Sequence, residues 1–240
     1  MRKKRGYIRE TPQHLVRDYR LFAIACEGEK REPMYFSMFQ NMSPRITVDI
    51  IGEIVSIEEM NEHHQQRSSP EWVLDRAIKY VEKEGLADDD ELWFIMDIDK
   101  WSVEQIRAIA TYCDEKTNWH IALSNPCFEV WLYFHKKSDI SLSVSTTCNE
   151  FKNEISKFDS GGYNAIRWIK NLFTAIENAR NADSDPGHFI PNLRETKVYQ
   201  LCETLINLVG RNSFNEFIDK RLIELEKFEK EKIKLKKSGK

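Results

Sequence analysis

The sequence predicts an α/β fold in which a mainly parallel, four-stranded sheet is flanked by helices and followed by a helical C-terminal half. Three observations lead to this prediction. Four short apolar runs end at turn residues, as buried strands do. The segments between these runs have helical spacing of apolar side chains, and strands that alternate with such helices form parallel sheets through right-handed crossovers. After residue 126, helical patterns follow one another without a clear strand between them.

The first strand, helix and second strand lie near the N-terminus. Residues 20–26 form an apolar run that stops at Glu27, the pattern of a strand buried on both faces. Pro33 stands where the first turn of a helix accepts proline, and this helix is expected to end near residues 41–44. Residues 45–52 are rich in β-branched side chains and close with a glycine, which indicates the second strand.

A polar segment and a long helix follow. Residues 58–69 are expected to form a loop. Ser68 or Ser69 is a suitable N-cap, and Pro70 suits the first helical position. Apolar side chains then fall near helical spacing as far as Gly85, so this helix should cover one face of the sheet.

The last two strands and the remaining helices complete the pattern. Residues 91–96 are the third predicted strand, Ser102 caps a helix, and residues 119–123 are the fourth strand. Further helices are expected over residues 128–135, 150–158, 164–181, 196–209 and 217–237. The last of these mixes apolar side chains with alternating charges, which is typical of an exposed or partner-binding helix.

The chain is expected to divide into four parts. These are a basic N-terminal arm over residues 1–19, an α/β core over 20–135, a helical region packed on the core over 136–211, and a charged C-terminal helix over 212–240. Either basic end could contact phosphate or remain a solvated tail, and the charge pattern leaves both open.

The composition says more about where the protein is located than about its function. Lys and Arg number 36 against 39 Asp and Glu, so the net charge of −3 shows no global excess of positive charge toward nucleic acid. The five cysteines form no metal-ligand spacing, which indicates reduced thiols, and Cys26 and Cys127 are expected to pack rather than react. No apolar run reaches the roughly 18 to 20 residues of a membrane span, and the chain start lacks the apolar core of a signal peptide. We expect a soluble cytoplasmic protein without a membrane partner.

Acidic side chains follow three of the predicted strands directly. Glu27 comes after the first and Asp97 and Asp99 after the third, and Glu129 lies six residues beyond the fourth. Parallel strands end at one edge of the sheet, so these carboxylates should converge in one crevice. Crowded carboxylates repel, and a divalent cation is the commonest group that makes such a cluster tolerable. Oxygen ligands of this kind select Mg²⁺ or Mn²⁺.

Each candidate also has an ordinary structural explanation. Asp97 and Asp99 would point the same way from extended backbone and suit a shared metal. Glu27 lies on a glycine-containing turn that could instead be a helix-capping turn, with Lys30 placed to neutralise a phosphate. Glu129 could orient metal-bound water, or act as a common helix-start carboxylate.

Aromatic and histidine side chains offer further candidates. Trp101 follows Asp99 and could stack on a nucleic-acid base, but a lid over the next helix is favoured. His63 and His64 lie in the polar loop, where a solvent-exposed role is expected rather than catalysis.

Longer motifs match a known family. Residues 26–36, 97–99 and 124–135, together with the later segment 196–199, resemble the RloB-like family over roughly residues 20–208. The resemblance implies a Toprim-like sheet, the fold that topoisomerases, primases and overcoming-lysogenization-defect nucleases use for metal-dependent phosphodiester chemistry. It also implies a place in bacterial anti-phage or abortive-infection loci beside an ABC-type or AAA-type ATPase.

The resemblance assigns the Toprim acidic roles to Glu27, Asp97 and Asp99 as metal ligands, with Glu129 a motif residue of less certain role. No further acidic residue follows two positions after Asp99, which leaves the number of metals open. We therefore expect a metal-dependent nuclease in which Glu27 is a ligand or general base and Lys30 stabilises charge on the phosphate. RNA, tRNA and DNA all remain open as substrates, and so does a homo-oligomer. The alternative is a non-catalytic adaptor or sensor that binds the ATPase.

Overall fold

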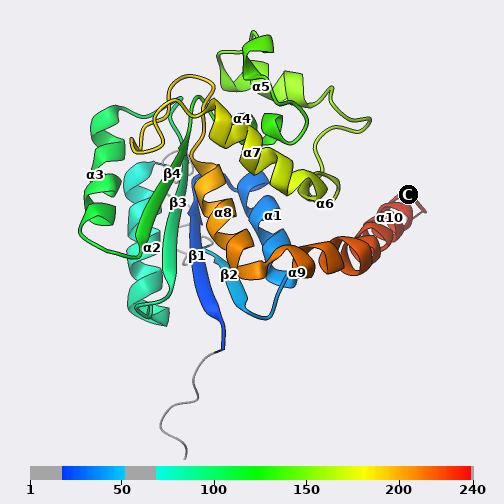
Figure 1. Cartoon of the computed structure of the whole chain (residues 1–240), viewed down its shortest axis with the longest axis horizontal. Helices are drawn as coiled ribbons and strands as arrows, with labels where there is room; N and C mark the ends of the chain where they lie inside the picture. The colour runs from blue at the N-terminus through cyan, green and yellow to red at the C-terminus, as the bar shows by residue number, and fades with distance from the viewer. Residues whose placement is uncertain (1–17, 52–68, 239–240) are drawn as a thin grey trace, which may run out of the picture.

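Four parallel strands form the centre of the molecule. The computed structural model describes residues 18–51 and 69–238. The sheet has the order β2-β1-β3-β4 (Figure 1), and each neighbouring pair is parallel. Its members are β1 (Arg20–Cys26), β2 (Ile46–Ile50), β3 (Glu91–Asp97) and β4 (Trp119–Ser124). The predicted α/β class with a mainly parallel, four-stranded sheet is confirmed.

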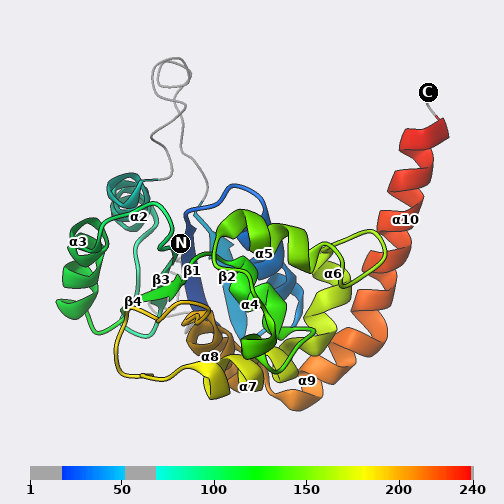
Figure 2. The ribbon, with the colours of Figure 1, turned by 90° about the horizontal axis from the view of Figure 1, so that it is seen from above.

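Helices connect the strands and make up most of the C-terminal half. In chain order they are α1 (Arg31–Phe36), η1 (Ser37–Asn41), α2 (Pro70–Glu84), α3 (Val103–Asp114), α4 (Glu129–Phe134), η3 (Ile140–Leu142), α5 (Cys148–Ile155), α6 (Ala165–Trp168), η4 (Ile169–Asn171), α7 (Leu172–Ala182), α8 (Val198–Val209), α9 (Arg211–Glu216), η5 (Phe217–Arg221) and α10 (Leu222–Ser238). Helices α2 and α3 cover one face of the sheet, and α1, α4, α7 and α8 lie on the other (Figure 2).

Alternation along β3 shows why both faces are covered. Leu92 and Phe94 belong to the apolar cluster under α2 and α3, whereas Trp93 and Ile95 belong to the larger cluster on the opposite face. Successive side chains of a strand point to opposite faces, so a run that is apolar at every position needs a layer on each side. By the same alternation, Asp97 continues the face of Trp93 and Ile95.

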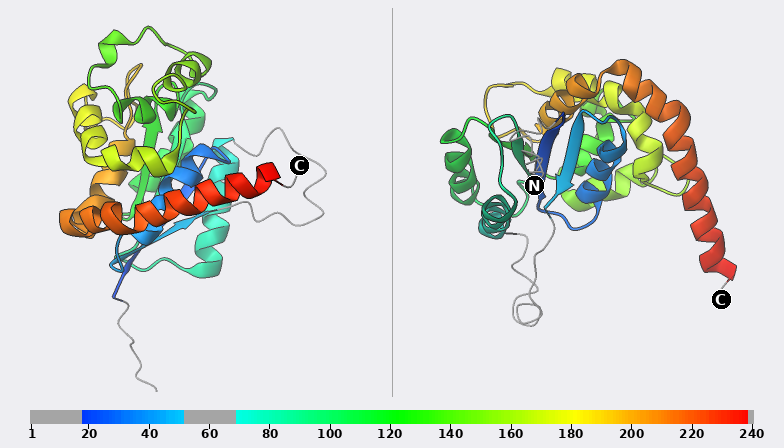
Figure 3. Two further views of the ribbon diagram at one scale, coloured as in Figure 1. Left: turned by 90° about the vertical axis from the view of Figure 1, so that its right-hand side faces the viewer. Right: turned by 90° about the horizontal axis from the view of Figure 1, so that it is seen from below.

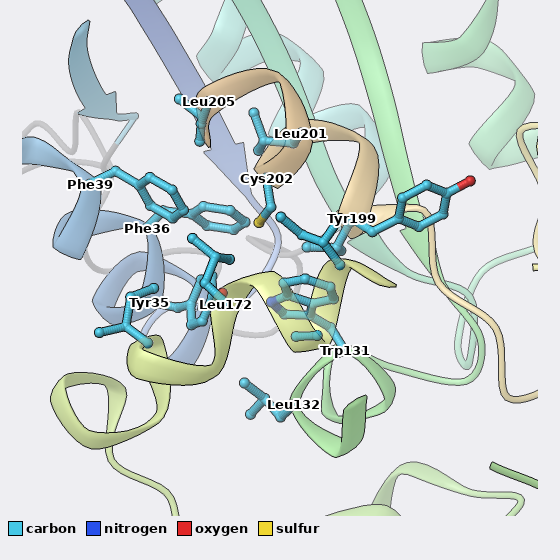
Figure 4. Packing of buried hydrophobic residues seen from close by; sticks show 14 of the residues in the cluster. Tyr35, Phe36, Phe39, Trp131, Leu132, Leu172, Tyr199, Leu201, Cys202 and Leu205 are labelled. Carbon is cyan, nitrogen blue, oxygen red and sulfur yellow. The ribbon is translucent and has the colours of Figure 1, made fainter. Parts of the chain in front are cut away.

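The larger cluster joins the sheet to the C-terminal helices. Figure 4 shows Tyr35 and Phe36 of α1 and Trp131 of α4 packed together with Leu201 and Cys202 of α8. All five side chains are almost fully buried. The cluster therefore makes the helical half part of the same core as the sheet.

His135 is a packed histidine in this cluster. It forms the C-cap of α4 and is 2% exposed. Its ring nitrogens lie 3.0 Å from the Tyr35 hydroxyl and 3.1 Å from the Trp131 carbonyl oxygen. Burial lowers the pKa of His135 to about 3, so the ring is neutral.

Local capping signals are found where they were expected. The Ser69 side chain accepts a hydrogen bond from the Trp72 amide at 3.4 Å, with Pro70 at the start of α2. Ser102 and Gln105 form a reciprocal capping box at the start of α3. Both helix starts are thus confirmed.

Two helix predictions differ from the structure in detail. The helix expected over residues 164–181 is divided into α6, η4 and α7. The C-terminal helix begins earlier, as α9, passes through the π-helical turn η5 and projects from the body as α10 (Figure 3).

Three predicted segments lie wholly or mostly outside the described residues. They are the basic arm up to residue 17, most of the 58–69 loop with His63 and His64, and the chain end at residues 239–240. Among the described helices, none is long and apolar enough to cross a bilayer.

Candidate functional site

A cleft of about 520 Å³ opens beyond the carboxyl ends of β1 and β3. Its acidic lining residues are Glu27, Glu29, Glu32, Asp97 and Glu129. Parallel strands bring their ends to one edge, so acids distant in the sequence meet here. The expected convergence of Glu27, Asp97 and Glu129 is therefore present.

Glu27 is held in one position by two hydrogen bonds. Its Oε2 accepts from the Asp97 backbone N–H and its Oε1 from the indole N–H of Trp101, both at 3.0 Å. The residue is 7% exposed, and burial raises the pKa of Glu27 to about 6 against the opposing effect of these donors. Trp101 thus orients a carboxylate at the cleft, which is a more specific role than the lid that was expected.

Asp97 is the last residue of β3 and lies beside Glu27. Its Oδ1 accepts a hydrogen bond from the Phe128 backbone N–H at 2.8 Å. Burial, then the charge of Glu27 and then that of Glu32, raise the pKa of Asp97 well above its ordinary value. Burial and the acidic neighbours both disfavour the ionised form of this carboxylate.

Asp99 has a different environment from Asp97. The strand ends at Asp97, and the Ile98 N–H turns to donate to the carbonyl oxygens of Ser124 at 3.0 Å and Pro126 at 3.2 Å. The extended backbone that would point both carboxylates the same way is therefore absent at Asp99. Asp99 is exposed and is not one of the residues that line the cleft. Its role as a metal ligand stays a prediction.

Glu32 is a carboxylate that the sequence analysis missed. It lies in the first turn of α1, is 8% exposed and lines the cleft. Its carboxylate packs directly over Gly28, where an added Cβ would come within 2.2 Å of Oε2. Burial raises the pKa of Glu32. The available signal was its position five residues after Glu27, but acids are common in first helical turns for unrelated reasons.

Basic side chains surround the acids. Arg31 forms an ion pair with Glu129, which is 3% exposed. Lys30, Lys100 and Lys152 also line the cleft and are exposed. Glu129 therefore links the start of α1 to the start of α4, and the three lysines provide positive charge around a more buried acidic floor.

The segment at residues 196–199 contacts the end of β4, next to the loop that leads to the cleft. The Lys197 N–H donates to the Leu123 carbonyl oxygen at 2.7 Å, and the hydroxyls of Ser124 and Thr196 lie 2.8 Å apart. Lys197 is buried and its Nζ lies 2.6 Å from Oδ1 of Asp183. These contacts hold the end of β4, from which the chain runs to the Phe128 N–H that binds Asp97.

A family model described as RloB-like protein matches residues 22–205. The chain belongs to the RloB-like family. The match runs from β1 into α8 and so includes every residue of the cleft in this RloB-like protein. The resemblance seen in the sequence motifs is thereby confirmed. No curated protein and no solved structure matches the chain.

Proposed function

We propose that this RloB-like protein is a metal-dependent nuclease that hydrolyses phosphodiester bonds of RNA or DNA. The observation that supports the proposal is the meeting of Glu27, Glu32 and Asp97 in one cleft. Burial raises the pKa of each of the three, and the charges of Glu27 and Glu32 contribute further to that of Asp97. A divalent cation removes this repulsion, and an all-oxygen donor set suits Mg²⁺ or Mn²⁺. The donor chemistry of these carboxylates therefore suits the expected metal.

Glu27, Glu32 and Asp97 would hold the cation, with Asp99 as a further expected ligand from the adjoining turn. When bound, the cation supplies Lewis-acid polarisation of a phosphate and lowers the pKa of a water molecule. The hydrogen bond from Trp101 keeps Glu27 oriented toward this position. As the alternative to holding the cation, Glu27 could act as the general base, a role that its pKa of about 6 suits.

The lysines around the cleft have a separate task. Lys30, Lys100 and Lys152 are exposed, whereas Arg31 is already paired with Glu129. Exposed lysines bind phosphate as mobile point charges and position a nucleic-acid backbone without reading its sequence. We assign to Lys30 the stabilisation of charge on the scissile phosphate, and to Lys100 and Lys152 contacts with the flanking phosphates.

The family further supports a role in bacterial anti-phage defence, in the cytoplasm, with an ABC-type or AAA-type ATPase. Helix α10 is the element that we assign to this partner, because it projects from the body and leaves Phe228 67% and Ile223 44% exposed (Figure 1). The same observation favours the second candidate, a non-catalytic adaptor or sensor that binds the ATPase through α10.

One experiment separates the two functions. The purified chain is incubated with labelled RNA, tRNA and DNA in Mg²⁺, Mn²⁺ or EDTA, with and without the ATPase encoded beside it. Cleavage should require the metal, and Asp97→Asn and Glu32→Gln should each reduce it by about 100-fold or more, the scale of a positioned catalytic group. The exposed Glu82 provides the matched control, Glu82→Gln, which should cleave normally.

Two results would count against the proposal. Cleavage by Asp97→Asn at the rate of the unchanged protein would show that the cleft is not the catalytic site. Binding of the ATPase without cleavage of any substrate, under every metal condition, would favour the adaptor.

A further inference from the structure

A second group of metal-ligating side chains lies beside the carboxylate cleft. Asp97, Cys127 and Cys148 each offer one ligand atom, and these atoms all lie within 4.8 Å of one another. They come from the end of β3, the loop after β4 and the first residue of α5. The sequence predicts only a packing role for Cys127, and Cys148 lies 51 positions beyond Asp97.

The backbone fixes this arrangement. Cys127 immediately precedes Phe128, whose N–H donates to Oδ1 of Asp97, so the thiol and the carboxylate are held by one short loop. Cys148 is placed by the start of α5, where Thr147 and Glu150 form a reciprocal capping box. The loop after β4 and the start of α5 thus bring both thiols to the end of β3.

Burial and reduction state both suit a ligand site. Cys127 is 0% and Cys148 8% exposed, and both are free thiols. The Cys127 thiol, burial and the Asp99 carboxylate raise the pKa of Cys148 above its ordinary range. A cysteine binds a cation through its thiolate, so binding releases the thiol proton, and a strongly thiolate-seeking ion favours this exchange.

Two sulfurs and one carboxylate are not a set that Mg²⁺ prefers, because hard cations select oxygen. Zn²⁺ takes cysteine sulfur and carboxylate oxygen together, and a site with three protein ligands keeps a fourth position for water. We propose that Asp97, Cys127 and Cys148 bind a thiophilic divalent cation of the Zn²⁺ class. On binding, each thiol loses its proton to solvent and its sulfur bonds to the cation as a thiolate, without any change of oxidation state.

Asp97 belongs to both groups of ligands. If the cleft is the nuclease site proposed above, a cation at the thiols takes Asp97 from the oxygen-bound metal, and Zn²⁺ should inhibit cleavage in Mg²⁺. The binding of the thiophilic cation itself does not rest on that function. The two proposals can thus fail independently.

The test uses Co²⁺, which gives thiolate charge-transfer absorption in the near ultraviolet when it is bound by cysteine. The reduced, full-length protein should develop this absorption up to one Co²⁺ per chain. Zn²⁺ should abolish it, and excess Mg²⁺ should not. Cys148→Ser should lose most of the absorption, whereas Cys113→Ser, at a buried thiol of α3, should retain it.

Circular dichroism and a count of thiols in denaturant confirm that each protein is folded and reduced. Absence of thiolate absorption in the folded, reduced, unchanged protein would overturn the proposal, and so would full absorption in Cys148→Ser. If Cys148→Ser does not fold, Cys148→Ala and the comparison of Zn²⁺ with Mg²⁺ on the unchanged protein decide the question. None of these measurements depends on nuclease activity.

Discussion

Replacing Glu27 with glutamine should reduce the pH dependence of the free energy of unfolding. Burial raises the pKa of Glu27 from 4.5 to about 6. The folded protein therefore holds this proton more tightly than the unfolded chain does. The stability associated with the proton is fully present below about pH 4.5 and is lost as the pH rises through about 6.

The magnitude follows from the two pKa values. The difference of 6 minus 4.5 is about 1.5 pH units, which at about 1.4 kcal/mol per unit corresponds to about 2 kcal/mol. Glu27→Gln should change the pH dependence by at least this amount, because the charge of Glu27 also raises the pKa of Asp97, as the largest cause after burial. Glu27→Gln removes both effects while its side-chain oxygen still accepts one of the two hydrogen bonds from Asp97 and Trp101.

Urea unfolding followed by circular dichroism, in EDTA from about pH 4.5 to about pH 7.5, measures the effect. The unchanged protein should lose at least about 2 kcal/mol more over this range than Glu27→Gln. Glu82→Gln should follow the unchanged protein, because Glu82 is exposed. Parallel curves for the unchanged protein and Glu27→Gln would refute the reasoning, since Glu27 would then titrate as an ordinary exposed carboxylate.

Two further substitutions test the contacts around the cleft. Gly28→Ala should fold, but its melting temperature should rise less with added Mg²⁺ than that of the unchanged protein. The new Cβ would lie 2.2 Å from Oε2 of Glu32 and would displace that carboxylate. An unchanged response to Mg²⁺ would exclude Glu32 as a ligand. Lys197→Met should lower the free energy of unfolding in urea by roughly 3 to 5 kcal/mol, because it removes the cationic partner of the buried Asp183 carboxylate. Lys220→Met, in an exposed pair, is the control and should leave the free energy of unfolding nearly unchanged; equal effects of the two lysine substitutions would contradict the role of burial.

Much of the α/β core could be predicted from local patterns. Strand β1 is apolar from Leu21 to Cys26, as a strand covered on both faces must be. Ser69 and Ser102 cap helices through contacts within one turn. Glu27 and Asp97 could be paired because parallel strands end at a common edge. Each of these inferences needs only the period of a strand, the chemistry of a cap or the direction of a sheet.

The composition of the site depended on the tertiary structure. Glu32 could not be distinguished from an ordinary first-turn acid until its carboxylate was seen packed over Gly28. Cys148 gives no metal-ligand spacing with Cys127 or Asp97, and their meeting depends on how α5 packs across the end of the sheet.

The sequence by itself determined the order of strands and helices along the chain, the helix caps and the edge of the sheet at which acids gather. These follow from the local period of side chains, from contacts within one helical turn and from the parallel direction of the strands. Only the tertiary structure decided which acids and thiols share a space, and it places Asp99 beside the Cys148 thiol rather than in the lining of the cleft. Side chains far apart in the chain are brought together by packing between layers, and that packing has no local signature in the sequence.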